Sequence, residues 1–354
     1  MALRLRRASS ADRYARQVAL AGVGAKGQRR IRKARILVVG LGGLGCPAAA
    51  YLAGAGVGRL GLCDFDTVEL SNLPRQPLYA AADVGRPKVE AARDHLASMN
   101  PDVDLALHPE ALDAENALRT VRGYDVAVDG TDSLEARDAL NAACLKAKVP
   151  WVQAGIAGWE AQVAVFVPGG PCYRCLHPTA VATGPTCAEE GVLGPLPGVA
   201  GTLQAVEALK LVLGLPTLAG RVLLWDAKAA RWDALVVARR PDCPACGKGR
   251  RAAAAPEVDV AEARRLLAGP SPPLVVDVRT GLERRLDRLD GSLHLPMGAL
   301  DEARRRLPAG RPLLVHCAVG MRSRRAARRL RELGFDAVSL RGGLRAWRRA
   351  ERRA

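Results

Sequence analysis

The chain has 354 residues, of which 49% are hydrophobic and 25% charged, and its formal net charge is +17. A chain of this length and composition is typical of a soluble protein with two or three domains. Because no apolar stretch approaches the roughly 20 residues that a membrane helix needs, we expect no membrane-spanning segment.

The N-terminal segment MALRLRRASSADRYARQ is basic but lacks the apolar core of a signal peptide, which favours a cytoplasmic protein. Nine cysteines in such a chain argue against disulfide bonds and for metal binding or catalysis. Cys46, Cys63 and Cys144 lie in apolar helix or strand patterns and are predicted to be core residues. The basic runs in the C-terminal third are interpreted first as solvated helix faces. No nucleic-acid recognition motif accompanies them, and the charge would also attract an acidic protein partner or an anionic substrate.

A strand, a glycine-rich turn and a helix are predicted in succession from Arg35, in RILVVG, GLGGLG and CPAAAYLAGAGV. Further strands are predicted in RLGLCD, which ends at Asp64, in VAVDGTD at 126–132 and in QVAVFV at 162–167. Strands that alternate with helices indicate an α/β fold, here a Rossmann-like, doubly wound domain with a mainly parallel sheet.

This first domain is expected to occupy residues 1–248. Residues 249–256 are small, basic and without pattern, which predicts a linker. A second, smaller α/β domain is predicted at 257–354, because PLVVDVR at 273–279 and PLLVHC at 312–317 are buried-strand patterns that each end where a loop begins.

Gly40, Gly42 and Gly45 form a GxGxxG pattern between the first strand and its helix. Glycines allow a tight turn and a close approach of the backbone to phosphate, and the helix N-terminus offers free N–H groups to an anion. Asp64 ends the next strand, where an acid can bind ribose hydroxyls. Alone, this pattern is weak evidence and would indicate an NAD-dependent oxidoreductase.

Polar residues that follow the later strands do not fit an oxidoreductase. They are Asp66, Asn72, Arg75 and Gln76 in DFDTVELSNLPRQPLY, Lys88 in VGRPKVEAA, and Asp132 in DGTD. Cations and carboxylates around a glycine loop suit a triphosphate with Mg²⁺, because phosphoryl-group chemistry develops charge that they stabilise. The set therefore favours ATP.

Two CxxC pairs, Cys172 with Cys175 and Cys243 with Cys246, supply four thiolates. A single pair could be a redox dithiol, but two pairs are typical of a structural Cys₄ zinc site. Cys187 lies in VATGPTCAEEGVLGP, a glycine- and proline-bounded stretch that is too irregular for a core segment.

Cys317 ends a predicted strand and is followed by AVGM, Arg322 and a helix. We expect an exposed thiol, with backbone N–H groups, the helix N-terminus and Arg322 depressing its pKa. Cysteine phosphatases place one residue more between cysteine and arginine, so this loop suits the terminal sulfur of a persulfide better than phosphate. His316 is interpreted as structural, and Asp277 and Arg279 as residues that brace the loop.

Together these motifs resemble known families. In order, RYARQ, GLGGLG, DFDTVELSNLPRQ, GRPKVEAA, GTDS, PCYRC, TCAEEGVLGP and CPAC are similar to the adenylyltransferases that activate ubiquitin-like sulfur carriers for molybdopterin and thiamine synthesis, relatives of the ubiquitin-activating enzymes. This resemblance covers residues 10–248. Over residues 257–350, DVRTGLE, LLVHCAVGMRS and LRGGLRAW resemble a rhodanese, a sulfurtransferase domain.

The resemblance implies ATP, Mg²⁺ and Zn²⁺ as cofactors and assigns roles to individual residues. Gly43 would lie against the phosphates, Asp64 would hold the ribose, and Asp132 would bind Mg²⁺. The remaining nucleotide contacts would come from Asn72, Arg75, Gln76 and Lys88.

The resemblance also implies partners. Arg16 in RYARQ, beside Arg13, would reach the ATP site of a neighbouring subunit, which implies a homodimer. Cys187 would bond covalently to the carrier. Cys317, with Arg322 adding positive potential, would take sulfur from a cysteine desulfurase or thiosulfate.

The expected reaction is adenylylation of a carrier that ends in Gly-Gly, followed by sulfur transfer to give a thiocarboxylate. The product would serve molybdopterin, thiamine or thiolated tRNA synthesis. Two alternatives remain open: an NAD-dependent oxidoreductase with a regulatory rhodanese-like module, and a non-catalytic scaffold for sulfur-trafficking proteins.

Overall fold

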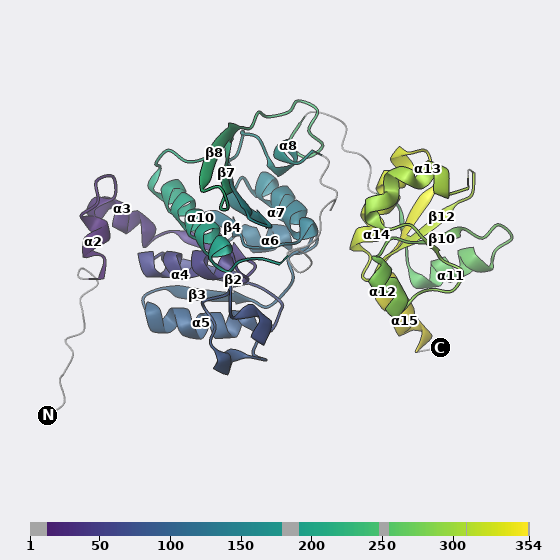
Figure 1. Ribbon diagram of the computed structural model, residues 1–354, viewed down its shortest axis with the longest axis horizontal. Helices are drawn as coiled ribbons and strands as arrows, with labels where there is room; N and C mark the ends of the chain where they lie inside the picture. Colours follow the sequence, from purple (N-terminus) through teal and green to yellow (C-terminus); the bar gives the residue numbers. More distant parts are fainter. Residues whose placement is uncertain (1–12, 179–190, 248–254, 309, 353–354) are drawn as a thin grey trace. The chain divides into compact units, whose positions relative to one another are not determined.

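The computed structural model describes residues 13–178, 191–247, 255–308 and 310–352. The described chain separates into two compact units, one before and one after residue 250 (Figure 1). Both units are α/β, as the sequence predicts.

The first unit is built on an eight-stranded sheet with the order β3-β2-β1-β4-β5-β6-β7-β8. The strands are β1 (Arg35–Val39), β2 (Arg59–Cys63), β3 (Asp104–His108), β4 (Val126–Asp129), β5 (Trp151–Ala157), β6 (Glu160–Phe166), β7 (Arg221–Asp226) and β8 (Arg231–Val236). The strands from β3 to β5 are parallel, while β5 to β8 form an antiparallel meander. The predicted Rossmann-like sheet is therefore confirmed, and it carries an antiparallel extension.

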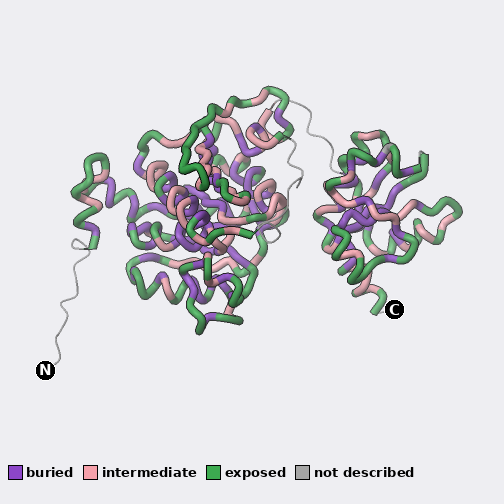
Figure 2. Tube along the Cα trace, in the orientation of Figure 1, coloured by how far each residue is buried: buried purple, intermediate pink, exposed green. Residues whose placement is uncertain are grey.

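Apolar side chains on both faces explain why these strands lie in the middle of the unit. Along β1, Ile36 and Val38 join one core cluster while Leu37 and Val39 join the other, because successive side chains point to opposite faces. Figure 2 shows the resulting buried centre. The first face is covered by α3 (Gly24–Ile31), α4 (Gly45–Ala55), α5 (Lys88–Met99) and α10 (Pro195–Leu213), and the second by α6 (Ala117–Val121) and α7 (Leu134–Ala147).

Helix α10 corrects the expectation that no apolar stretch is long enough to span a membrane. Its 19 residues meet that test by length and composition. Half of the apolar window is nevertheless buried inside the protein, and the helix packs against α4 and the strands β4 to β6. The buried amide of Gln204 donates to the backbone oxygen of Asp129 at 2.6 Å, so α10 is a core helix of the sheet.

The remaining elements of the first unit are short. They are α2 (Ala15–Val18), η1 (Leu70–Asn72), η2 (Ala81–Asp83) and α8 (Tyr173–Leu176). Cys46, Cys63 and Cys144 are buried, as predicted.

The second unit contains a five-stranded parallel sheet with the order β11-β10-β12-β13-β9. Its strands are β9 (Glu257–Val258), β10 (Leu274–Asp277), β11 (Leu293–His294), β12 (Leu313–His316) and β13 (Ala337–Leu340). Its helices are α11 (Val260–Ala268), α12 (Gly281–Leu286), η3 (Met297–Glu302), α13 (Ala303–Arg306), α14 (Met321–Glu332) and α15 (Gly343–Glu351). β12 lies at the centre of this sheet, so its carboxyl end is surrounded by the loops of neighbouring strands.

Candidate functional sites

The glycine loop connects β1 to α4. A Cβ on Gly45 would lie 1.8 Å from the oxygen of Gly40, and a Cβ on Gly40 (φ +84°) would lie 2.8 Å from the carbonyl carbon of Gly130. These positions exclude any side chain because the turn crosses the end of β4. A Cβ on Gly42 would meet nothing closer than the Nε2 atom of Gln76, at 3.8 Å. The loop is therefore tight against the sheet and open at Gly42.

Asp64 fastens this loop to the end of β2. Its Oδ2 atom accepts the N–H of Leu41 at 2.6 Å, and its Oδ1 atom accepts the N–H of Asp66 at 2.9 Å. Burial raises the pKa of Asp64, and the nearby Lys88 opposes this shift. The carboxylate thus holds the glycine loop in place beside a buried cation.

Lys88 is the first residue of α5 and is almost fully buried. Its Nζ atom lies 3.1 Å from a carboxylate oxygen of Asp66, and its backbone N–H donates to the backbone oxygen of Asp66 at 2.9 Å. Because Asp66 is also bonded to Asp64, these three predicted residues form one cluster next to the glycine loop.

The other predicted nucleotide residues lie in and after η1. Arg75 donates to the oxygen of Ser71 at 2.8 Å, and buried Asn72 accepts the N–H of Glu69 at 3.2 Å. Gln76 is 3% exposed, and its Oε1 atom has no hydrogen-bond partner among the described residues. Gly43 is enclosed by Pro197, whose Cβ atom would lie 3.1 Å from an added Cβ.

Two aspartates after β4 have different environments. Asp132 is exposed. Asp129 is fully buried, and it accepts hydrogen bonds from Thr131 Oγ1 at 2.7 Å and from Arg137 Nε at 3.1 Å. Burial raises the pKa of Asp129, while Arg137 opposes the rise. The sequence analysis missed this ion pair, although a charged residue at the end of a buried strand was a signal for it.

A cavity of about 310 Å³ opens on the antiparallel meander. It is lined by Arg137, Gly155–Ala157, Glu160–Gln162, Leu224–Asp226, Arg231 and Asp233. The Arg137 guanidinium also donates to the backbone oxygens of Thr131, beside Asp132, and of Ala154. The cavity therefore adjoins the loop that carries the predicted magnesium ligand.

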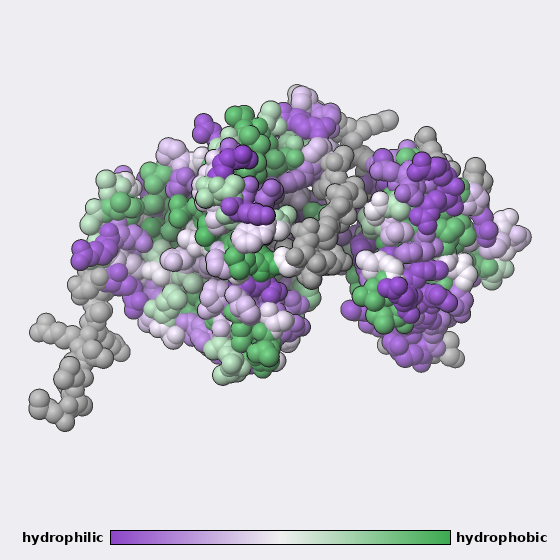
Figure 3. All heavy atoms as spheres, in the orientation of Figure 1, coloured by the Kyte–Doolittle hydropathy of each residue, from purple (hydrophilic) through white to green (hydrophobic). Residues whose placement is uncertain are grey.

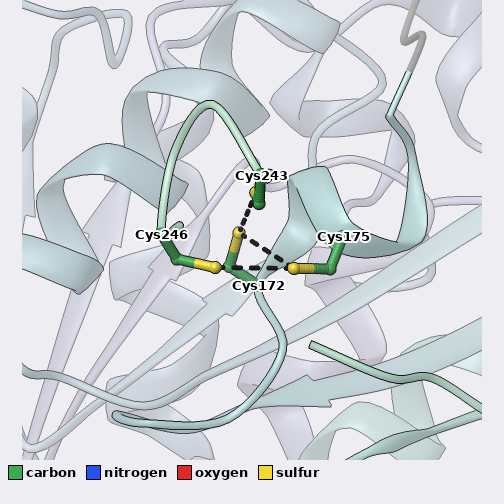
Figure 4. Close-up of side chains that lie close together, drawn as sticks. All are labelled: Cys172, Cys175, Cys243 and Cys246. Carbon is green, nitrogen blue, oxygen red and sulfur yellow. Dashed lines mark hydrogen bonds between the residues drawn. The ribbon is translucent and has the colours of Figure 1, made fainter. Parts of the chain in front are cut away.

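The four cysteines of the two CxxC pairs converge at one point (Figure 4). Their sulfur atoms all lie within 4.8 Å of one another, with Cys172–Cys243 at 3.6 Å and Cys175–Cys246 at 3.4 Å. A tetrahedron with bonds of about 2.3 Å to sulfur has edges of about 3.8 Å. The sulfur spacing is close to this edge length, so this donor set fits a zinc ion. The backbone N–H of Arg240 also points at Cys175 Sγ, at 3.4 Å.

One predicted site residue of the first unit, Arg16, lies apart from these clusters. Arg16 is exposed on α2. Next to it, Gln17 donates to the oxygen of Ala55, at the C-terminal end of α4, and Tyr14 accepts a hydrogen bond from Asn100, after the end of α5. Cys187 lies outside the described residues.

In the second unit, Cys317 follows β12 and is 1% exposed, so the expectation of an exposed thiol is wrong. The Cys317 side chain packs in the apolar core of the unit. The start of α15 contacts the loop through the backbone: the N–H of Leu344 donates to the Cys317 backbone oxygen at 2.8 Å. A Cβ on Gly343 would lie 2.4 Å from the same oxygen. The N–H of Gly320 points at the sulfur, at 3.1 Å.

Arg322 is ion-paired with Glu283 of α12. The sequence analysis did not single out Glu283. Arg322 Nη1 lies 2.8 Å from Glu283 Oε2, and Nη2 contacts Oε1. Hydrogen bonds from Arg322 lower the pKa of Glu283 to about 2. The signal in the sequence was a capping box, in which Thr280 and Glu283 exchange hydrogen bonds at the start of α12.

Beneath the loop, buried Asp277 binds Arg279 at 2.7 Å and Arg284 at 3.3 Å. His316 is fully buried, 3.8 Å from Asp277, and neither ring nitrogen has a hydrogen-bond partner among the described residues. Burial lowers the pKa of His316 to about 4, although Asp277 opposes this shift.

Comparison with known proteins finds a family match for each of the two units. The ThiF family profile matches residues 14–245, and the rhodanese-like domain profile matches residues 259–350. The pig protein adenylyltransferase and sulfurtransferase MOCS3 is 39% identical over 385 residues, which cover 95% of this chain and 85% of the relative. The sulfur carrier protein adenylyltransferase of Thermus thermophilus is 47% identical and covers 67% of this chain and 90% of the relative.

Among solved structures, Escherichia coli MccB in complex with MccA-N7isoASN is similar to this chain, with a TM-score of 0.60 at 23% identity. The similarity covers 68% of this chain and 75% of that chain. At this identity the likeness concerns the fold.

Proposed function

Because the chain belongs to the ThiF family and carries a rhodanese-like domain, we propose that it makes a thiocarboxylate on a ubiquitin-like sulfur carrier that ends in Gly-Gly. The chain is an enzyme with adenylyltransferase and sulfurtransferase activities. The relatives give no support to an NAD-dependent oxidoreductase. One observation carries the proposal: a nucleotide loop and a cysteine–arginine loop occur in the same chain.

In the first step, the carrier carboxylate attacks the α-phosphate of ATP, and pyrophosphate leaves. The opening at Gly42 and the cluster of Asp64, Asp66 and Lys88 support a nucleotide site here. The phosphate contacts would come from Arg75, Asn72, Gln76 and Lys88, and Asp132 would hold Mg²⁺. Mg²⁺, when bound, supplies charge neutralisation at the phosphates.

The cavity on the antiparallel meander would receive the C-terminal tail of the carrier. It adjoins the loop of Asp132 through Arg137, and its glycine and alanine positions at 155 and 157 leave room for an extended backbone. A tail that lies there would bring its carboxylate towards the nucleotide.

In the second step, Cys317 carries sulfur as a persulfide that it receives from a cysteine desulfurase or from thiosulfate. The terminal sulfur attacks the activated acyl carbon, and AMP leaves. A second thiol then attacks Cys317 Sγ, which releases the carrier thiocarboxylate and leaves Cys317 in a disulfide with that thiol. Cys187 would hold the carrier as a thioester between the steps, in which case its thiolate replaces AMP as the leaving group.

The Cys₄ cluster would hold a structural zinc ion, with Cys172, Cys175, Cys243 and Cys246 as ligands. The sulfur spacing supports this assignment, as does the absence of disulfides among the eight cysteines in the described ranges. Thiols that remain reduced also support a cytoplasmic location.

The protein would act as a homodimer. Arg16 lies next to residues bonded to the far ends of α4 and α5. At about 1.5 Å per residue, the 11 residues of α4 place the end of this helix about 16 Å from the glycine loop. An arginine anchored there would serve the nucleotide site of a partner subunit.

The deciding experiment is mass spectrometry of a carrier incubated with the full chain, ATP, Mg²⁺ and thiosulfate. We expect sulfur to replace one oxygen of the carrier carboxylate. The Cys317→Ala variant should release pyrophosphate but give no thiocarboxylate, and Lys88→Ala should give neither product. Equal thiocarboxylate formation by wild type and Cys317→Ala would contradict the assigned role of Cys317. The identity of the carrier that reacts would decide among molybdopterin, thiamine and tRNA thiolation.

A further inference from the structure

Arg322, the second residue of α14, is the first charged residue after Cys317. Ala318, Val319, Gly320 and Met321 are uncharged, and Arg322 follows them. In the structure, the guanidinium of Arg322 makes two parallel contacts with the carboxylate of Glu283. This fork-to-fork arrangement is the strongest geometry available to an arginine and a carboxylate.

Glu283 is fixed independently of Arg322. Its Oε2 atom accepts the backbone N–H of Thr280 at 2.9 Å and the hydroxyl of Thr280 at 3.0 Å. A carboxylate held by the start of its own helix does not need to reorganise in order to bind the arginine. An anionic ligand would therefore have to displace a preorganised partner before it could bind Arg322.

This arrangement matters for the two classes of sulfur donor. With thiosulfate, the Cys317 thiolate attacks the outer sulfur, the S–S bond breaks, and sulfite leaves as a dianion. With a persulfide, the same attack forms the Cys317 persulfide and expels a single thiolate. The first reaction needs positive charge beside the leaving group, and Glu283 neutralises the charge that Arg322 would supply.

Exposed apolar side chains flank both partners of the ion pair in the sequence, and we call these four residues the apolar rim. Leu282 and Leu286, which flank Glu283 on α12, are 61% and 80% exposed. Val319 and Met321, which precede Arg322, are 42% and 38% exposed. Among the described residues of the second unit, these are four of the five exposed large apolar side chains. The visible face of this unit is mostly hydrophilic (Figure 3).

We propose that Glu283 is a specificity-determining residue. By occupying Arg322, it selects donors of low charge that cover the apolar rim, such as a protein-bound persulfide, over inorganic thiosulfate. The proposal rests on sulfur transfer through Cys317, as given under the proposed function. It concerns which donor loads the cysteine and does not depend on the adenylylation step.

The test measures sulfur transfer from two donors to cyanide, as thiocyanate, with the full chain in the absence of ATP. The donors are thiosulfate and a monoanionic alkyl persulfide. We expect Glu283→Gln to raise kcat/KM for thiosulfate about tenfold, the equivalent of one charge-assisted hydrogen bond. The value for the alkyl persulfide should change less than about twofold, because that donor does not need the freed charge.

Glu332→Gln is the matched control, since Glu332 pairs with Arg329 at the other end of α14 and its loss changes the net charge equally. It should leave both values unchanged. Val319→Lys is a second variant, which adds a cation to the exposed rim while the Glu283–Arg322 pair stays intact. It should also favour thiosulfate, and it keeps the proposal testable if Glu283→Gln does not fold.

The donor preference decides the outcome. If neither variant shifts the thiosulfate-to-persulfide ratio, or if Glu283→Gln lowers both values equally, then Glu283 has only a structural role and the proposal is wrong. A separate result would concern the proposed function: if Cys317→Ala still forms thiocyanate from both donors, sulfur transfer does not proceed through Cys317.

Discussion

At the scale of single residues, each unit contains an aspartate that ends a buried strand and binds an arginine. Asp129 ends β4 and binds Arg137, and Asp277 ends β10 and binds Arg279. A buried carboxylate is stable only if its charge is paired and its oxygens are hydrogen-bonded. Both aspartates meet these conditions, and both lie next to the loops that we propose carry chemistry.

Removal of Asp129 should destabilise the first unit strongly. Asp129→Ala leaves Arg137 without its partner in a largely buried position, which typically costs about 3–5 kcal/mol. The free energy of unfolding by urea measures this loss. Asp125→Ala is the control: its pair with Arg35 is about half exposed, so the expected loss is below about 1 kcal/mol. Similar losses for the two variants would contradict the importance of the buried pair.

His316 should make the stability of the second unit dependent on pH. The pKa of its buried ring is lowered from 6.5 to about 4, so between these values the unfolded chain binds more protons than the folded chain. The contribution of the neutral His316 to the free energy of unfolding is therefore fully present above about pH 6.5. It falls as the pH drops towards 4, by at most about 3 kcal/mol. Asp277, Arg279 and Arg284 are the charged groups that face the ring.

The measurement is the unfolding free energy of the second unit between pH 4 and 7, for the wild type and for His316→Leu. The variant should lose the part of the slope that belongs to the buried imidazole. Parallel curves would mean that His316 does not carry this dependence.

Residue identities were easier to predict than residue environments. The sequence identified Cys317 and Arg322, but it implied an exposed thiol, whereas the Cys317 side chain packs in the core with residues from other strands and helices. Glu283 was overlooked because its partner lies 39 residues further along the chain. Such contacts depend on tertiary packing, which a local motif does not contain.

At the scale of elements, the turn between β1 and α4 separates two kinds of glycine. Gly45→Ala should prevent the turn from forming, because the new Cβ would lie 1.8 Å from the Gly40 oxygen. Gly42→Ala has open space and should fold with nearly normal stability, while it loses ATP affinity because the methyl group intrudes where phosphate would approach. Thermal unfolding and ATP-binding calorimetry distinguish the two effects. Normal ATP affinity in Gly42→Ala would place the nucleotide elsewhere.

The Cys₄ cluster joins α8 to the segment that follows β8. We expect one zinc ion per chain by elemental analysis, and its loss in Cys172→Ser. Because a structural zinc ion contributes directly to folding, the variant and the chelated protein should both unfold at lower temperature. Cys144→Ser, at a buried cysteine outside the cluster, should keep the metal. A wild-type protein without metal that is equally stable would show that the four thiols pack without an ion.

The strands were the most predictable elements. RILVVG, RLGLCD and VAVDGTD form β1, β2 and β4 as expected, because a buried parallel strand needs a continuous apolar run and little else. The direction of β6 was not predictable, since QVAVFV has the same pattern in either orientation. Its antiparallel pairing follows from the short turn after β5, which is too brief for a crossover helix.

At the scale of the whole molecule, the anchoring of α2 makes a prediction about subunits. An Arg16→Ala chain and a Lys88→Ala chain should each be inactive in pyrophosphate release when pure. Mixed after dissociation, they should regain about a quarter of wild-type activity, because half of the dimers are hybrid and one site of each hybrid combines both intact residues. Retained activity in pure Arg16→Ala, or no recovery on mixing, would contradict an arginine supplied by the partner subunit.

The burial of Cys317 also has a consequence for the lifetime of the sulfur that it carries. Small thiols in a reducing cell strip sulfur from any persulfide that they can reach, because they attack the S–S bond directly. Cys317 is 1% exposed, so thiols in solution have little access to its sulfur, and we expect the second thiol of the proposed mechanism to reach Sγ only after the carrier has bound. The Cys317 persulfide should therefore lose its sulfur to small thiols only slowly, and the protein should keep this sulfur until an activated carrier arrives.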